Sequence, residues 1–245
     1  MQKQFAKYIS VVLLFIFGFT AIATGATQVS SLSLRLTNNI QSGNSSSIKG
    51  RVTAAESDLP LAYGTVIIAG KTATIHDGYF EMENLVKGDH LLRVDGPFRE
   101  TLEIIISTSS GENNLDLAVK SILSQAEIDM LARITRAEAE GESHRGQTAV
   151  AASVLNRVLS SRYPSNVQEV VYQKISGRYQ YSPVSDGRIR LAPKTASYHA
   201  AHAALAGNDP SLGATGFFNP TKTRDLWVRS NPVTTIIDGH TFFSY

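Results

Sequence analysis

The sequence predicts a multi-domain protein with an N-terminal all-β sandwich and a C-terminal α+β domain that is mostly helical. Residues 47–119 consist of short runs rich in β-branched residues, and Gly, Pro or Asp lies in nearly every gap between the runs. Residues 121–245 instead repeat apolar residues at helical spacing. The chain has 245 residues, 42% of them hydrophobic, which is enough for one or two domains with a buried core.

The first 26 residues have the three parts of a secretory signal peptide. Lys3 and Lys7 precede an apolar run from Ile9 to Ala23, and small residues at a plausible cleavage site follow. We expect cleavage because no basic cluster follows the run, although its length also suits an uncleaved membrane anchor. Residues 27–46 are rich in Ser, Asn and Gln, which predicts a flexible linker. The sequence therefore predicts export, with membrane contact only if the signal is retained.

Short runs within residues 47–119 predict the strands of the sandwich. Their close and regular spacing is typical of this architecture. Asp77–Gly78 predicts a tight hairpin turn, because glycine tolerates the positive φ that such a turn requires. The runs are SIKGRV, YGTVIIAG, TATI, YFEME, HLLRVDG, LEIIIS and NLDLAV.

The same residues resemble the carboxypeptidase-regulatory-like family. The resemblance rests on IKGRV, PLAYGTVIIAG and TIHDGYFEMENLVKGDHLLRV, which contain the G-x-V, P-L-x-x-x-x-V and D-G-x-F patterns of that family. It implies a transthyretin-like sandwich that serves as a structural or adhesion module without chemistry and that could contact wall or surface proteins. His76 and His90 are therefore expected to be ordinary strand residues.

The residues that follow are helical in pattern. Ser124 to Glu127 fits a capping box, in which the Ser side chain caps the helix and the Glu side chain reaches back. Ile128, Leu131, Ala132 and Thr135 then recur at helical spacing, so one side of this helix is expected to be buried. Further helices are predicted in HRGQTAVAASVLNRVLSSRYP, NVQEVVYQK and APKTASYHAAHAALAGNDP, and short strands in the aromatic-rich tail.

The first predicted helix ends in RAEAEGES, which contains Glu138, Glu140 and Glu142. Glu138 alone is in phase with the buried side of the helix, whereas Glu140 is expected to face solvent. A partly buried carboxyl group has a raised pKa and holds a proton near neutral pH, as a general acid requires. From spacing alone, a solvated acidic helix end is the simpler explanation of the three glutamates.

Four segments resemble the spore cortex-lytic, SleB-type cell wall hydrolase family over nearly all of residues 125–245. They are TRAEAEGESHRGQTAVAASVLNRV, YQYSPVSDGRI, ASYHAAHAALAGNDPSLGATGFFNP and WVRSNPVTTIIDGHTFF. The resemblance implies a lysozyme-like domain around a groove, located in the cell wall or spore envelope. It also implies cleavage of the peptidoglycan glycan strand between N-acetylmuramic acid and N-acetylglucosamine, chiefly by lytic transglycosylation. The first Glu of the family's G-E-A-x-G-E pattern is the catalytic acid, and it aligns with Glu138.

The chain departs from the family pattern at several positions. Ala137 replaces the Gly before the acid, Tyr181 replaces a Phe, and the closing I-G-x-H becomes Ile237 to His240 with a local shift. The peptidoglycan-binding repeat often found before this domain is replaced by the predicted sandwich. These departures leave open whether the substrate is spore cortex or vegetative wall.

A single carboxyl group suffices for lytic cleavage. It protonates the glycosidic oxygen, and its carboxylate then takes the proton of the sugar's own 6-hydroxyl, which closes an anhydro ring. Water is not the nucleophile, so the second carboxylate of ordinary glycosidases is unnecessary. Glu142 is the candidate for a second carboxylate, which would make the enzyme a hydrolytic muramidase. A non-catalytic wall-binding protein is the remaining alternative, and we favour the transglycosylase on the resemblance.

Several aromatic and amide side chains are candidates for substrate binding. Tyr181, Phe217, Phe218 and Trp227 could stack on sugar rings or could belong to the core. Asn219 precedes a proline, which favours an extended backbone from which its amide could reach a sugar hydroxyl; the alternative is a turn-forming Asn.

Polar residues near the acid are further candidates. Glu142 could orient the substrate, and Asn156 and Arg157 could support the acidic site or lie on a polar helix face. Residues 143–245 contain 11 Lys and Arg against 5 Asp and Glu, and this net charge of +6 suits a polyanionic wall polymer. The export signal argues against nucleic acid as the partner.

No cofactor or metal ion is expected. The chain contains no cysteine, which excludes thiol nucleophiles and thiolate metal sites. His199 and His202 lie three positions apart, but no third ligand is evident. The sequence also has no phosphate-binding loop, nucleotide fingerprint or G-x-S-x-G motif.

Overall fold

The computed structural model describes residues 45–245. The expected signal peptide and almost all of the expected linker lie outside the described residues, while the last two linker positions belong to the first strand. In the described part of the chain, no helix is long and apolar enough to cross a membrane.

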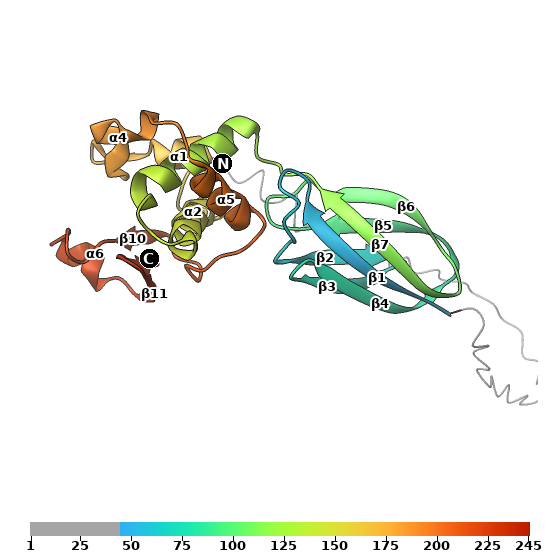
Figure 1. Ribbon diagram of the computed structural model, residues 1–245. Coiled ribbons are helices and arrows are strands. Elements are labelled where there is room, and N and C mark those ends of the chain that lie inside the picture. Colours follow the sequence, from blue (N-terminus) through green and yellow to red (C-terminus); the bar gives the residue numbers. More distant parts are fainter. Residues whose placement is uncertain (1–44) are drawn as a thin grey trace, which may run out of the picture. The chain divides into compact units, whose positions relative to one another are not determined.

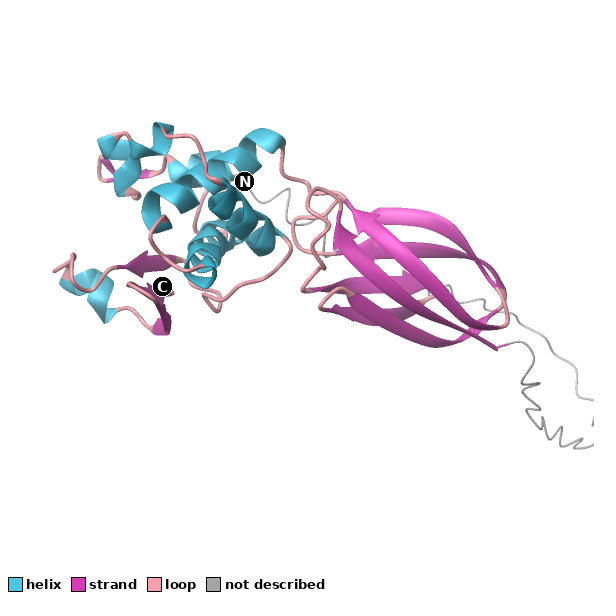
Figure 2. Ribbon diagram, in the orientation of Figure 1, coloured by secondary structure: helices cyan, strands magenta, loops and turns pink. Residues whose placement is uncertain are grey.

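The N-terminal part of the described chain is all-β, as predicted (Figure 2). Each of the seven predicted runs overlaps an observed strand, with bounds that differ by a few residues. The strands are β1 (Ser45–Ala54), β2 (Tyr63–Ile68), β3 (Lys71–His76), β4 (Tyr79–Val86), β5 (Gly88–Asp95), β6 (Leu102–Thr108) and β7 (Gly111–Val119).

These strands follow one another in the order β6-β5-β2-β3-β4-β1-β7. All neighbours are antiparallel except β1 and β7, which are parallel. β3 and β4 pair only at His76 and Tyr79, beside the predicted turn, where Asp77 and Gly78 both have positive φ. Strands that precede and follow the β3–β4 turn in the strand order bury alternate residues in one shared core. Val66 of β2 and Ile48 of β1 are examples. The strands therefore form two layers around that core.

The C-terminal part contains the four predicted helices, two short helices that were not predicted, and a small sheet (Figure 1). One of the unpredicted helices is LWVRS in the tail, where only irregular segments and short strands were expected. The capping box of Ser124 and Glu127 is present, and the first helix ends before Gly141. The helices are α1 (Gln125–Ala139), α2 (His144–Leu159), α3 (Val167–Val171), α4 (Ser182–Asp186), α5 (Thr195–Leu205) and α6 (Leu226–Ser230), with a 3-10 turn at Arg188–Arg190. The strands are β8 (Lys174–Ile175), β9 (Arg178–Tyr179), β10 (Gly216–Phe218), β11 (Val233–Ile237) and β12 (His240–Phe243).

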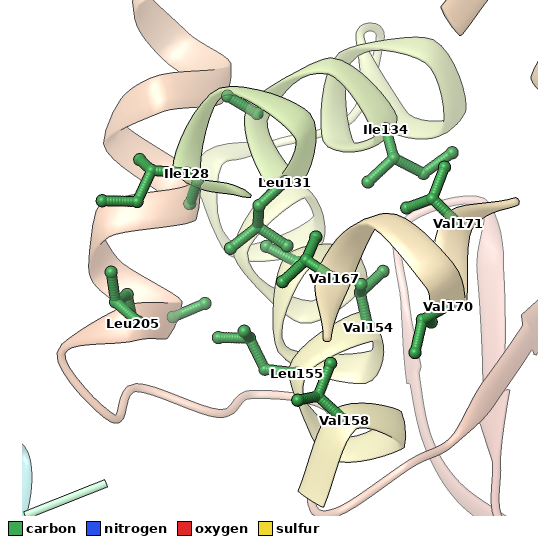
Figure 3. Close-up of a cluster of buried hydrophobic side chains, with 14 of the residues drawn as sticks. Ile128, Leu131, Ile134, Val154, Leu155, Val158, Val167, Val170, Val171 and Leu205 are labelled. Carbon is green, nitrogen blue, oxygen red and sulfur yellow. The ribbon is translucent and has the colours of Figure 1, made fainter. Parts of the chain in front are cut away.

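The core of this part lies between α1, α2, α3 and α5 (Figure 3). Leu131 and Ile134 of α1, Val154 of α2 and Leu205 of α5 are completely buried there. A smaller cluster, which includes Val150 of α2 and Phe242 of β12, joins α2 to the sheet β10-β12-β11. The C-terminal strands are therefore held against the end of α1 and the start of α2.

One segment of the β region also contributes to the helical core. Phe98, between β5 and β6, belongs to the buried cluster of the helical part. Its neighbour Arg99 is buried, donates a hydrogen bond from Nη2 to the Leu205 carbonyl at 2.8 Å, and pairs with Glu56 at 2.6 Å. The β and helical parts thus share a buried contact.

Candidate active site

Glu138 lies in the last turn of α1, where two cavities meet. One cavity has a volume of about 490 Å³ and the other about 260 Å³, and Glu138, Arg188 and Lys222 line both. In the described part of the chain, the Glu138 carboxyl makes no hydrogen bond, although it is only partly exposed. Larger hollows of 640 to 720 Å³ lie elsewhere, but none of them is lined by Glu138. The carboxyl is therefore free to contact a ligand.

Burial raises the pKa of the Glu138 carboxyl from 4.5 to about 7. The positive charges of Arg188, Lys222 and Arg157 act in the opposite direction, and the Asp186 carboxylate adds to the increase. Because loss of hydration outweighs the nearby cations, Glu138 keeps a proton up to neutral pH. This is the protonation state that a general acid needs.

The larger cavity combines one carboxyl group with cations, aromatic rings and amides. Glu138 is the only acidic residue among the described residues that line it. The others are Arg157, Gln180, Tyr181, Ser182, Arg188, Phe217, Phe218, Asn219, Lys222, Thr223 and His240.

Arg157 is a buried cation in the wall of this cavity. Its guanidinium packs against the rings of Tyr163 and Tyr181, with its carbon 5.1 and 5.0 Å from the ring centroids. Its Nε donates to the Thr215 carbonyl, whereas its Nη1 is buried without a hydrogen bond. Tyr181 is also buried, so its ring packs on Arg157 instead of presenting an open face to a sugar. The expectation of sugar stacking at Tyr181 is therefore corrected.

Arg188 connects the end of α1 to the segment after α4. Its Nη1 donates to the Ala137 carbonyl at 2.7 Å, and its Nε donates to Asp186 at 2.9 Å. These bonds hold the guanidinium beside Glu138, where it contributes to the pKa of that carboxyl. Lys222, whose side chain makes no hydrogen bond in the described structure, adds an exposed cation to the lining of the cavity.

Phe218 and Asn219 line the cavity, as expected of substrate-binding residues. Phe218 is partly exposed and packs against Phe243 and the guanidinium of Arg229. The Asn219 side-chain carbonyl accepts hydrogen bonds from the Thr221 backbone and hydroxyl at 2.9 and 2.6 Å. Asn219 is thus a turn-forming residue, and its NH₂ group makes no hydrogen bond in the described structure and is free to donate.

Glu142 binds the turn between β11 and β12. Its Oε2 accepts a hydrogen bond from the Gly239 backbone N–H at 3.0 Å, and its Oε1 lies 3.7 Å from Nδ1 of His240. It lines the smaller cavity but not the larger one. Both oxygens therefore face protein groups of the C-terminal hairpin.

Two predicted site residues line neither of the cavities at Glu138. The Asn156 amide donates to Asp209 at 2.9 Å and to the Ala214 carbonyl at 3.0 Å, which fixes the loop after α5. Trp227 is 57% exposed on α6 and packs edge-on against Tyr245. The structure places Asn156 as a support of the fold and Trp227 on the outer surface.

Glu140 lies at the edge of the smaller cavity and does not line the larger one. It is exposed, and its carboxylate pairs with Lys194 and Arg136, which lowers its pKa. Six residues that line the larger cavity were not predicted as site residues: Gln180, Ser182, Arg188, Lys222, Thr223 and His240. Arg188 and His240 lie in segments that resemble the hydrolase family. That resemblance could have identified these two residues as candidates for the site.

Comparisons with known proteins find similarity to cell wall enzymes. The family model described as Cell Wall Hydrolase matches residues 141–243, beginning three positions after Glu138. The spore cortex-lytic enzyme of Halalkalibacterium halodurans is 37% identical over 133 residues, which are 54% of this chain and 39% of that protein. The spore cortex-lytic enzyme of Oceanobacillus iheyensis is 30% identical over 177 residues, which are 69% of this chain and 63% of that protein. The chain thus spans less than two thirds of the length of these relatives.

A solved structure is similar over the same part of the chain. The catalytic domain of the germination-specific lytic transglycosylase SleB from Bacillus anthracis is 34% identical, with a TM-score of 0.46. The similarity covers 50% of this chain and 98% of that chain. The C-terminal part of this chain, residues 141–243, therefore matches the cell wall hydrolase domain.

Proposed function

We propose that this protein cleaves the glycan strand of peptidoglycan between N-acetylmuramic acid and N-acetylglucosamine, as a lytic transglycosylase with Glu138 as its acid. The observation that carries the proposal is a carboxyl group with a pKa of about 7 and no hydrogen bond, located where two cavities meet. The match of residues 141–243 to the Cell Wall Hydrolase family model supports the substrate class.

The reaction needs one proton donor that later becomes a base. Protonated Glu138 gives its proton to the glycosidic oxygen, and the bond between that oxygen and C1 of the muramic acid residue breaks. The Glu138 carboxylate then takes the proton of the 6-hydroxyl of the same sugar, whose oxygen bonds to C1. The anhydro ring forms without water, and Glu138 ends the cycle protonated.

The surroundings of the acid favour this reaction over hydrolysis by a second carboxylate. Among the described residues, only Glu138 brings a carboxyl group to the larger cavity. Glu142 is the nearest alternative in sequence, but one of its oxygens accepts the Gly239 N–H and the other faces His240. A hydrolytic enzyme would need a carboxylate that is free to activate water.

Substrate binding is assigned to groups in the walls of the larger cavity. Phe218 offers a partly exposed ring, Asn219 a free amide donor, and Arg157 and Lys222 positive charge. Trp227 would contact the glycan only beyond the cavities. For the β region we propose a carboxypeptidase-regulatory-like module that contacts the wall or a surface protein.

We further propose that the protein is exported and acts in the cell wall or spore envelope. The apolar N-terminal run supports export, and the relatives named spore cortex-lytic enzymes support action on cortex. Vegetative wall remains the second candidate substrate, because a β region precedes the catalytic domain here.

The test is to incubate residues 45–245 with purified peptidoglycan and to identify the soluble products by mass. Anhydro-ended fragments are expected. Products with reducing ends would show hydrolysis instead, and binding without release would show a wall-binding protein. Cortex and vegetative peptidoglycan, supplied in parallel, would identify the preferred substrate.

A further inference from the structure

The turn between β11 and β12 is bound to the turn between α1 and α2. Asp238 Oδ2 accepts hydrogen bonds from the Ser143 backbone N–H at 2.9 Å and from its hydroxyl at 2.6 Å. Glu142 Oε2 accepts the Gly239 N–H at 3.0 Å. These bonds join residues almost one hundred positions apart, and His240 follows directly in the chain. The position of His240 is therefore fixed relative to the end of α1, which carries Glu138.

The His240 ring is held by aromatic neighbours and has one free side. It packs edge-on against Phe217, with the ring centroids 5.2 Å apart, and against Phe242 at 6.2 Å. Nδ1 is buried without a hydrogen bond. Nε2 also makes no hydrogen bond in the described structure, but it is not buried, and His240 lines the larger cavity. Nε2 is thus the ring nitrogen that faces the cavity.

Glu142 decides which ring nitrogen carries the proton. Its Oε1 lies 3.7 Å from Nδ1, which is too far for a normal hydrogen bond but close enough for a strong electrostatic preference. A proton on Nδ1 points at this carboxylate, whereas a lone pair on Nδ1 would be repelled by it. Burial lowers the pKa of His240, although Glu142 acts in the opposite direction, so the ring is neutral at neutral pH. The favoured neutral form has its hydrogen on Nδ1 and a lone pair on Nε2.

We propose that His240 is a substrate-contacting residue that accepts, at Nε2, a hydrogen bond from an N–H or O–H group of the glycan. Glu142 is the positioning residue that fixes the Nδ1–H tautomer of His240. The identity of the ligand rests on the proposed function, whereas the tautomer is a property of the free protein. The lone pair on Nε2 selects a donor group, which the acetamido N–H and the hydroxyls of the glycan both provide.

The tautomer is tested by nitrogen NMR of the protein labelled with ¹⁵N-histidine, with the His240 signals assigned from the His240→Gln variant. The wild-type protein is expected to show Nδ1–H. In Glu142→Gln, the amide oxygen keeps the Gly239 bond and the NH₂ group faces Nδ1, so the proton is expected to move to Nε2. An Nε2–H tautomer in the wild-type protein, or no change in Glu142→Gln, would overturn the role of Glu142.

The contact is tested by binding of N-acetylglucosamine oligomers to the inactive Glu138→Gln protein. Adding His240→Phe, which keeps the ring packing, is expected to weaken binding by about fivefold to tenfold, the usual effect of one hydrogen bond. Adding His240→Gln, which keeps an acceptor near the position of Nε2, is expected to restore most of the affinity. His199→Gln, at an exposed position of α5, is the matched control and should change nothing. Equal affinity of the Phe and Gln variants, both shown to be folded by thermal unfolding, would overturn the contact.

Oligomers in which an O-acetyl group replaces the acetamido group distinguish the two donor groups, because they keep the carbonyl and lose the N–H. If the acetamido N–H is the donor, His240→Phe has no effect on their binding; if a hydroxyl is the donor, it weakens their binding as before. These outcomes are separate from the proposed reaction. If Glu138→Gln released glycan fragments at the wild-type rate, the role of Glu138 would fail while the tautomer and binding results would stand.

Discussion

At the scale of single residues, the substitution Glu138→Gln tests the acid directly. It keeps the size of the side chain and removes the transferable proton, so release of anhydro-ended fragments should fall at least about 100-fold. Binding to peptidoglycan should be retained. Glu140→Gln is the matched control, because Glu140 is exposed and paired with Lys194 and Arg136. If Glu138→Gln kept the wild-type rate, the segment RAEAEGES would be only a solvated acidic helix end.

The pKa of Glu138 sets the pH dependence of activity. The free enzyme must hold the proton, so kcat/KM on soluble glycan strands should be constant below the pKa of about 7 and fall above it. The expected slope is about tenfold per pH unit, because each unit removes nine tenths of the remaining protonated form. A profile that stayed flat up to pH 9 would exclude Glu138 as the acid.

The same carboxyl group should reduce stability at high pH. Its pKa is raised from 4.5 to about 7, so the folded protein binds this proton more tightly than the unfolded chain does. The resulting stabilisation is complete below pH 4.5 and is lost as the pH rises to 7. Glu138→Gln does not titrate, so its free energy of unfolding relative to wild type should increase by about 1 to 3 kcal/mol between pH 5 and pH 8. Urea unfolding at the two pH values measures this, and an equal difference at both would contradict the raised pKa.

At the scale of elements, the site depends on the contact between the two turns. Gly146, in the first turn of α2, allows the close approach, since a Cβ there would lie 2.4 Å from Asp238 Oδ2. Asp238 in turn accepts from the backbone and hydroxyl of Ser143, the N-cap of α2. The Asp238 side chain therefore both binds the N-cap residue of α2 and helps to fix the position of His240.

Asp238→Ala should destabilise the protein and reduce activity together. It leaves the Ser143 donors without this partner, which is expected to cost about 1 to 2 kcal/mol in denaturant unfolding. It also frees the hairpin that positions His240, so glycan release should decrease. Asp116→Ala, at an exposed position of β7, is the control, since the Asp116 side chain makes no hydrogen bond or ion pair in the described structure. Unchanged stability in Asp238→Ala would show that the turns do not need this contact.

At the scale of the whole molecule, the β and helical parts depend on each other through Phe98 and Arg99. Phe98 is only 8% exposed, and its surroundings are the helical core although it follows a β-strand. Arg99 donates to the last residue of α5. A fragment that begins at residue 121 would lose both residues, so we expect it to be less stable than residues 45–245.

Phe98→Ala isolates this effect within the intact chain. Removal of the ring from the core should cost about 3 kcal/mol and should speed hydrogen exchange in α1 and α5. Ile105→Ala is the control, because Ile105 is 68% exposed on β6. If exchange changed only within the β strands, the helical core would not need Phe98.

The sequence by itself predicted most of the secondary structure, and its family resemblance singled out Glu138 as the candidate acid. Alternation and turn residues predicted every strand from β1 to β7, and the capping box and apolar spacing predicted α1. These signals are local, because the period of a strand or a helix can be recognised within a few neighbouring residues. The location of Glu138 on the partly buried side of α1 followed from the same spacing.

Only the tertiary structure decided what surrounds Glu138. Spacing could not show that His240 and Lys222 line its cavity. Nor could it show that the Asn156 side chain hydrogen-bonds to the loop after α5. The two oxygens of Glu142 face a hairpin nearly one hundred residues away, which spacing also could not show. Cavity walls are assembled from segments distant in sequence, and the direction of each side chain depends on contacts that only the packed chain makes. The raised pKa has the same origin, since burial by those segments is what removes water from the carboxyl group.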